Sequence, residues 1–182
     1  MEKSRTKTQM LALSALFAAL TAACSQIQIP LPMVPINLAL FSVHLSALLL
    51  GKKYGALSQA IYILLAAVGV PVMAGFTGGL GILMGKTGGY AIGYILSAFL
   101  TGLICEKWGT EFWKMCIAAV VGCAACYVLG TIWFMVVTGL DLGTSLAYCV
   151  LPFLPGDAVK IVLAGALAVR LRPALKLTMA NA

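Results

Sequence analysis

The chain has 182 residues, of which 62% are hydrophobic and only 9% are charged, and its formal net charge is +7. A soluble globular domain carries about 25% charged residues and roughly 45–50% apolar ones. This composition therefore excludes a soluble enzyme, a disordered segment and a secreted disulfide scaffold. We expect an all-α integral membrane protein whose residues 1–182 form a single transmembrane domain.

The positive charge does not indicate a nucleic-acid partner. Proteins that bind nucleic acid gather Lys and Arg on one exposed face, whereas here the basic residues form short groups between apolar runs. The first group, at residues 3–7, precedes an apolar stretch and resembles the start of a signal peptide. Because further hydrophobic runs follow, we expect this stretch to be retained as the first helix.

Six apolar stretches are candidate transmembrane helices, since about 20 apolar residues cross a bilayer. They cover roughly residues 9–27, 36–51, 54–70, 87–105, 114–138 and 145–171. With a cytoplasmic N-terminus, only Lys86 falls in an outer loop, Lys160 lies within a span, and the other basic residues are cytoplasmic. These are Lys3, Arg5, Lys7, Lys52, Lys53, Lys107, Lys114, Arg170, Arg172 and Lys176. The positive-inside rule thus predicts a six-helix bundle in the cell membrane with both termini in the cytoplasm.

Three segments are apolar but rich in residues that break helices. Residues 29–37 contain three of the seven prolines, residues 71–90 contain seven glycines, and Pro152 and Pro155 interrupt the last span. The predicted topology places all three segments on the outer side. Lipid cannot satisfy the N–H and C=O groups of non-helical backbone, so such segments fold against protein or a water-filled cavity. We expect them to cover a pocket that faces outwards.

Asp157 and Lys160 are the strongest candidates for a functional site. They are three residues apart, so they share one face of a helix, and that helix is expected to begin just after Pro155-Gly156. Ionisable residues within a span are costly and usually mark a substrate or ion path. The alternative is a pair that neutralises itself and only holds the end of the helix.

No reactive set of side chains accompanies this pair. His44 is isolated, and Cys123 and Cys126 are expected to be small packing residues within a helix. The run Gly85-Lys86-Thr87 resembles the end of a phosphate-binding loop, but Leu80 stands where that motif needs glycine. We therefore expect no enzyme activity, no metal and no cofactor in this chain.

Small residues at four-residue spacing mark one face of the first helix, as at Ala15 and Ala19. Such faces allow close helix–helix approach in lipid. The spacing alone is equally consistent with packing inside the bundle and with docking of a partner.

These features together describe a protein that binds a small amphipathic acid. Lys160 would bind an anionic group, Asp157 would accept N–H donors, and Phe76 and Tyr90 would supply aromatic surface. The chain shows no inverted repeat of the kind that secondary transporters use. A binding subunit that takes its energy from partners fits better than a self-sufficient pump.

Several motifs resemble the BioY family of biotin transporters, and they extend from about residue 11 to residue 172. They are Pro30-x-Pro32-x-Val34-Pro35-Ile36, Leu48-Leu49-Leu50-Gly51, Gly55-Ala56-Leu57-Ser58, Gly69-Val70-Pro71-Val72, Gly78-Gly79-Leu80-Gly81, Thr87-Gly88-Gly89-Tyr90 and Pro152-Phe153-Leu154-Pro155-Gly156-Asp157-x-x-Lys160. The resemblance implies a substrate-binding (S) component of a bacterial energy-coupling factor (ECF) transporter. Such a subunit captures a vitamin outside and associates with a transmembrane coupling protein and two ABC ATPases, which use ATP. The family's docking face on the first helix maps onto Ala15 and Ala19.

The resemblance also suggests roles for individual residues toward biotin. Lys160 would meet an oxygen, Asp157 or Asn37 would accept a ureido N–H, and Tyr90 and Phe76 would pack against the ring. The glycine-rich backbone of residues 75–79 would approach the ligand closely. The predicted substrate-binding residues are Asn37, Gly75, Phe76, Thr77, Gly79, Tyr90, Asp157 and Lys160.

Two departures from the family pattern concern the pocket. Asn37 and Ala39 stand where many members have Thr and Gln, and Lys86 stands where many have Pro. Two other classes of function stay open: a stand-alone or proton-coupled transporter of another small carboxylic acid, and a structural subunit without a ligand.

Overall fold

The computed structural model describes residues 7–30 and 34–175, and this part of the chain is almost entirely helical. The helices are α1 (Lys7–Gln26), α2 (Ala39–Ala67), α3 (Leu80–Leu83), α4 (Gly88–Trp108), α5 (Phe112–Thr138), α6 (Leu142–Cys149) and α7 (Leu154–Leu175). Two short antiparallel strands, β1 (Gln28–Ile29) and β2 (Ile36–Asn37), join α1 to α2. The predicted all-helical fold is thus confirmed in its class, with this strand pair and the four-residue α3 as additions.

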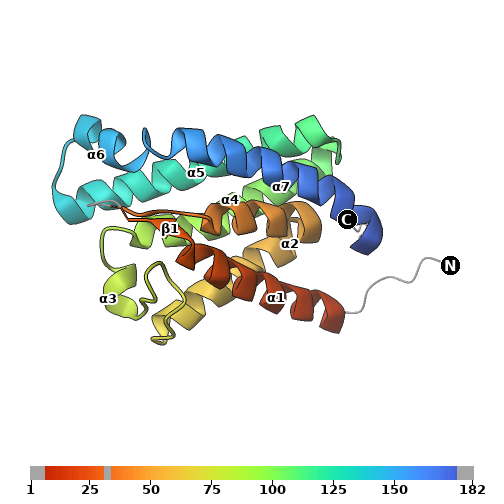
Figure 1. Cartoon of the computed structure of the whole chain (residues 1–182), viewed down its shortest axis with the longest axis horizontal. Helices are drawn as coiled ribbons and strands as arrows, with labels where there is room; N and C mark the ends of the chain where they lie inside the picture. Colours follow the sequence, from red (N-terminus) through yellow and green to blue (C-terminus); the bar gives the residue numbers. More distant parts are fainter. Residues whose placement is uncertain (1–6, 31–33, 176–182) are drawn as a thin grey trace.

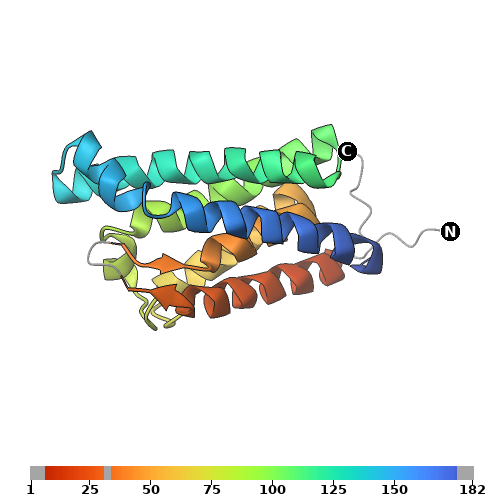
Figure 2. The ribbon, with the colours of Figure 1, turned by 45° about the horizontal axis from the view of Figure 1, so that its top comes forward.

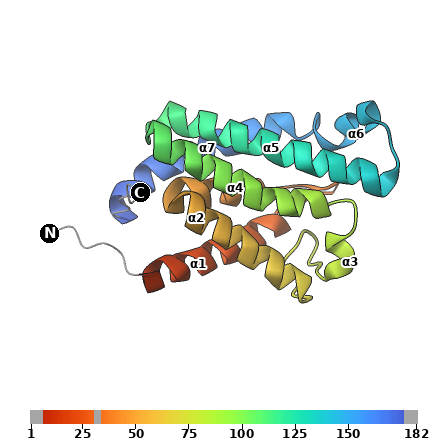
Figure 3. The same ribbon diagram turned by 180° about the vertical axis from the view of Figure 1, so that it is seen from behind.

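The second and third predicted spans are the two halves of α2. Gly51 lies between them with φ 77° and ψ −178°, a conformation that is essentially restricted to glycine. The chain reverses at this point, as Figures 1 and 3 show. A Cβ atom at Gly55 would lie 2.8 Å from the Cα of Ala47, so the two halves touch where the second has no side chain.

Glu106 near the end of α4 fastens this turn to the bundle. Its Oε1 accepts the backbone N–H of Lys52 at 2.9 Å, and its Oε2 lies 3.0 Å from the Lys52 Nζ. Gly102, one turn earlier in α4, leaves room for the turn, because a Cβ there would lie 2.3 Å from the Lys52 nitrogen. The reversal therefore depends on α4 as well as on its own glycines.

The surface of the bundle is apolar, while several side chains in its interior are polar. Along α5, for example, Val128, Ile132 and Val136 follow one another at four-residue spacing and are 61%, 58% and 78% exposed. Inside, the hydroxyl groups of Thr21 and Ser42 are hydrogen-bonded at 2.9 Å. Large apolar surfaces of this kind mark contact with lipid or protein.

Within residues 7–30 and 34–175, three helices, α1, α4 and α5, are long and apolar enough to cross a membrane. A fourth candidate is the pair α6 and α7, which are bent by 50° at the break that the two prolines predicted. The chain is therefore a multi-pass membrane protein by the length and composition of its helices.

The three irregular segments lie together at one end of the bundle, and α1 begins and α7 ends at the other (Figures 1 and 2). Most of the described basic residues lie at this second end, in the turns or near the ends of helices. Lys86, in the turn between α3 and α4, lies at the opposite end. Lys3, Arg5 and Lys176 fall outside the described residues.

Candidate functional site

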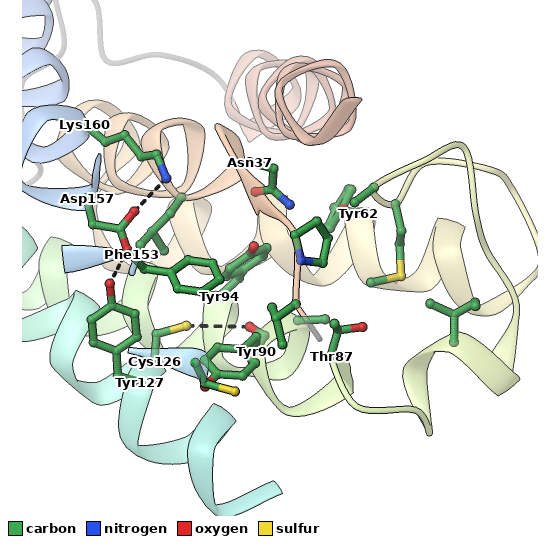
Figure 4. Close-up of a pocket in the computed structure, with 18 of the residues that line it drawn as sticks. Asn37, Tyr62, Thr87, Tyr90, Tyr94, Cys126, Tyr127, Phe153, Asp157 and Lys160 are labelled. Atoms are coloured by element: carbon green, nitrogen blue, oxygen red, sulfur yellow. Dashed lines mark hydrogen bonds and ion pairs between the residues drawn. The ribbon is translucent and has the colours of Figure 1, made fainter. Parts of the chain in front are cut away.

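A cavity of about 240 Å³ opens among the irregular segments. It lies below the roughly 300–1,000 Å³ of pockets for drug-sized ligands, so it suits a small molecule. Figure 4 shows polar side chains at one end of this cavity, aromatic rings in its middle and further polar groups opposite. Its walls are formed by Val34, Pro35, Asn37, Leu40, Tyr62, Met73, Ala74, Thr77, Ile82, Thr87, Tyr90, Ala91, Tyr94, Cys126, Tyr127, Cys149, Phe153, Asp157 and Lys160.

The polar end is a buried ion pair. The Lys160 Nζ lies 2.6 Å from Asp157 Oδ1, and the two residues are only 5% and 3% exposed. The hydroxyl of Tyr127, on α5, donates a hydrogen bond to Asp157 Oδ2. Asp157 lies in the first turn of α7, where the helix dipole also favours a negative charge. The pair therefore places an ammonium group beside a carboxylate, and each carboxylate oxygen already has one polar partner.

Aromatic side chains line the middle of the cavity. The rings of Tyr62 and Tyr94 lie 6.5 Å apart between centroids, at an angle of 33°. The Tyr90 hydroxyl is 3.2 Å from the Thr131 Oγ1, which holds that ring in place. Phe153 projects from the break between α6 and α7 (Figure 4). Such walls suit a flat apolar ring.

Asn37 supplies an oriented amide at another part of the wall. Its Oδ1 accepts the N–H of Ala39 at 3.0 Å at the start of α2. This hydrogen bond turns the side-chain NH₂ away from the helix start. The donor groups of the Asn37 amide therefore lie at the cavity wall without taking part in this cap.

The start of α6 is fixed by Asp141, outside the spans. Asp141 Oδ1 accepts the Thr144 hydroxyl at 2.6 Å, and Oδ2 accepts the Thr144 N–H at 3.0 Å. These hydrogen bonds lower the pKa of Asp141. The cap orients the short helix whose last residue, Cys149, lines the cavity.

Five predicted site residues line the cavity: Asn37, Thr77, Tyr90, Asp157 and Lys160. Gly75, Phe76 and Gly79 do not, although they belong to the segment beside it. Gly75 and Phe76 have φ values of 72° and 55°, and Phe76 is 73% exposed. The N–H of Gly79 donates to the Ala66 carbonyl at 2.6 Å. In this structure these three residues shape the backbone of the segment.

Sequence analysis missed Tyr62, Tyr94, Cys126, Tyr127 and Phe153. Tyr94 could have been found, because it lies four residues after Tyr90 and so on the same helical face. No local pattern identifies Tyr127 as the partner of Asp157, since 30 residues separate them. Only the packing of α5 against α7 brings the two together.

The predicted docking residues lie elsewhere. Ala15 and Ala19 are exposed on the outer face of α1, while Ser14, Phe17 and Ala18 on the same helix are buried. Packing within the bundle therefore uses a different face of α1 from the one that carries Ala15 and Ala19.

His44 lies outside the cavity walls. His44 is fully buried, as expected for a packed side chain, and neither ring nitrogen has a hydrogen-bond partner among the described residues. Within residues 7–30 and 34–175, no group of three His, Cys, Asp or Glu side chains is arranged to hold a metal ion.

An apolar helical bundle whose end cavity contains a buried ion pair defines a membrane-embedded protein that binds a small molecule. Residues 1–177 match the model of the BioY family, and the chain belongs to this family. Its relatives are named as transporters, which confirms the interpretation as a transport protein and not an enzyme.

The curated relatives match most of the chain. The biotin transporter BioY of Thermotoga maritima is 41% identical over 86% of this chain and 92% of its own length. The probable biotin transporter BioY of Pyrococcus horikoshii is 37% identical over 91% and 98%, respectively. Among solved structures, the S component for biotin from an ECF-type ABC transporter superposes with a TM-score of 0.86 at 30% identity. That match covers 93% of this chain and 95% of the other.

The ion pair generates a prediction about stability. Lys160→Met leaves Asp157 charged and buried, and should lower the free energy of unfolding by about 3–5 kcal/mol. The double variant Lys160→Met/Asp157→Leu removes both charges and should regain most of that loss. Unfolding by sodium dodecyl sulfate, followed by circular dichroism, measures both. A double variant as unstable as the single one would contradict this account.

Proposed function

We propose that this chain binds biotin and is the S subunit of an ECF-type transporter for high-affinity biotin uptake. The observation that carries the proposal is the match to the S component for biotin, which extends over 93% of the chain. The walls of the cavity support the proposal, because they combine an ion pair with aromatic side chains. No cofactor is assigned to this chain, because ATP would be used by the partner ATPases.

The arrangement of the cavity also favours one orientation of the ligand. The ureido group of biotin has a carbonyl oxygen beside two N–H donors. Lys160 and Asp157 offer a donor and an acceptor whose charged atoms are 2.6 Å apart, so they complement that group. The carboxylate tail of biotin would be repelled by Asp157 there, and buried charges interact strongly. We therefore place the ureido ring at the ion pair, the apolar ring among the tyrosines, and the tail away from Asp157.

Titration calorimetry with biotin tests the proposal. The purified wild type should bind biotin 1:1, and Lys160→Met or Asp157→Asn should weaken binding at least about 30-fold, since loss of one member of a buried pair costs about 2–5 kcal/mol. Lys53→Met, which removes a charge at the other end of the bundle, should bind like the wild type. Absence of binding by a folded wild type would refute the assignment.

The methyl ester of biotin distinguishes the two orientations in the same assay. If the ureido ring lies at the ion pair, Lys160→Met should weaken binding of the ester and of biotin by the same factor. A loss for biotin alone would place the carboxylate at Lys160.

We further infer that six segments cross the membrane: α1, the two halves of α2, α4, α5, and α6 together with α7. The termini would be cytoplasmic and the cavity external. The basic residues support this orientation, since most of those that the structure describes lie at the end where α1 begins and α7 ends. That this membrane belongs to a bacterial cell stays a prediction.

Cysteine labelling of intact cells tests the orientation. In a background without the native cysteines, Lys86→Cys should react with an impermeant maleimide, and Lys53→Cys should react only after the membrane is opened. Both lysines are exposed, one at each end of the bundle. The reverse pattern would invert the proposed topology.

A coupling protein would dock on the exposed face of α1 that contains Ala15 and Ala19. Tryptophan at either position should abolish co-purification with the coupling protein and two ATPases while leaving biotin binding unchanged. The matched control is Ala124→Trp, at an exposed alanine of α5. Biotin accumulation in vesicles that contain this chain alone would contradict the proposal and favour a stand-alone transporter.

A further inference from the structure

The segment between α2 and α3 forms a roof on the cavity. Its residues Met73, Ala74 and Thr77 line the wall. Met73 and Thr77 pair through two backbone hydrogen bonds, at 2.9 and 3.3 Å, and enclose the tight turn of Gly75 and Phe76. We call this short hairpin (residues 72–77) the roof. Met73 is buried in a cluster with Tyr62 and Ala66, whereas the exposed tip of the roof makes few backbone hydrogen bonds beyond the Met73–Thr77 pair.

Gln26, the last residue of α1, holds the roof from the side. Its Nε2 lies 3.2 Å from the Val72 carbonyl oxygen and 3.0 Å from that of Met73. Its Oε1 accepts the N–H of Phe76 at 2.9 Å. A single amide therefore contacts the first residues of the roof with its donor nitrogen and the tip of the turn with its acceptor oxygen.

Ser25 adds a second contact beside Gln26. Its hydroxyl donates to the Val72 carbonyl at 2.6 Å, and it is completely buried. Gln26 is the member of the pair that reaches the tip of the turn. Phe76, which Gln26 binds, is the only residue other than glycine with a positive φ among the described residues. A backbone conformation of this kind costs about 1–3 kcal/mol and persists only where its surroundings hold it.

We propose that Gln26 is a positioning residue that keeps the roof closed over the bound ligand. The proposal rests on the proposed function, since the ligand is the biotin assigned above. The new element is that the last residue of α1 determines the rate at which the ligand dissociates. Because the face containing Ala15 and Ala19 lies on the same helix, a displacement of α1 would reach the roof through these hydrogen bonds.

Hydrogen exchange of the ligand-free protein tests the clamp without relying on biotin. In Gln26→Met, which keeps the length of the side chain but has no amide, the peptide that covers the roof should exchange at least about tenfold faster, as expected for the loss of roughly one net hydrogen bond. The remaining peptides should be unchanged. Gln9→Met, at the other end of α1, is the matched control, and its roof peptide should exchange like that of the wild type. Unchanged exchange at the roof in Gln26→Met would overturn the clamp.

Binding kinetics test the role in retention. Biotin should dissociate from Gln26→Met about tenfold faster, a change comparable to that in roof opening, with a smaller change in the association rate. Gln26→Glu keeps the acceptor for Phe76 but lacks both donors, and should also release biotin faster. A dissociation rate like that of the wild type, with a loosened roof, would overturn the positioning role. Failure of the wild type to bind biotin would refute the proposed function, while the exchange result would still decide whether Gln26 clamps the roof.

Discussion

The ion pair of Asp157 and Lys160 is the constraint on which the site depends. A charge buried within a membrane protein is expensive unless a partner and hydrogen bonds compensate it. Lys160 provides the partner, and Tyr127 of α5 provides a hydrogen bond. The position of α7 relative to α5 is therefore tied to the geometry of this pair. The pair also lies at the wall of the cavity.

The irregular end of the bundle follows a second constraint, the need to satisfy backbone groups away from water. The Leu38 N–H donates to carbonyl oxygens at the end of α1, and the Gly79 N–H donates to Ala66 at the end of α2. The side chains of Ser25 and Gln26 donate hydrogen bonds to a carbonyl group of the roof. Helix ends thus supply the partners that lipid cannot, and these contacts hold the first two irregular segments beside the cavity.

Small residues decide how closely the helices approach. A Cβ at Gly122 would lie 2.2 Å from the Thr101 hydroxyl, and one at Gly130 would lie 2.3 Å from the Tyr90 ring. The second contact seats a ring that lines the cavity against α5. Close packing without side chains is how helices associate in lipid, where the hydrophobic effect does not drive them together. Gly130 therefore influences the position of a cavity-lining ring although it is not itself part of the wall.

The sequence by itself determined the membrane class, the positions of the apolar segments and their interruptions near Gly51 and Pro152. It also singled out Asp157 and Lys160, which the structure places together at the cavity wall. These features follow from hydropathy, backbone chemistry and charge, which are local properties of the chain. Only the tertiary structure decided that Tyr127 completes the ion pair, that Phe76 points away from the cavity wall, and that Gln26 holds the roof. The residues in these contacts are 30 to 50 positions apart, and no periodicity records which faces of distant helices meet.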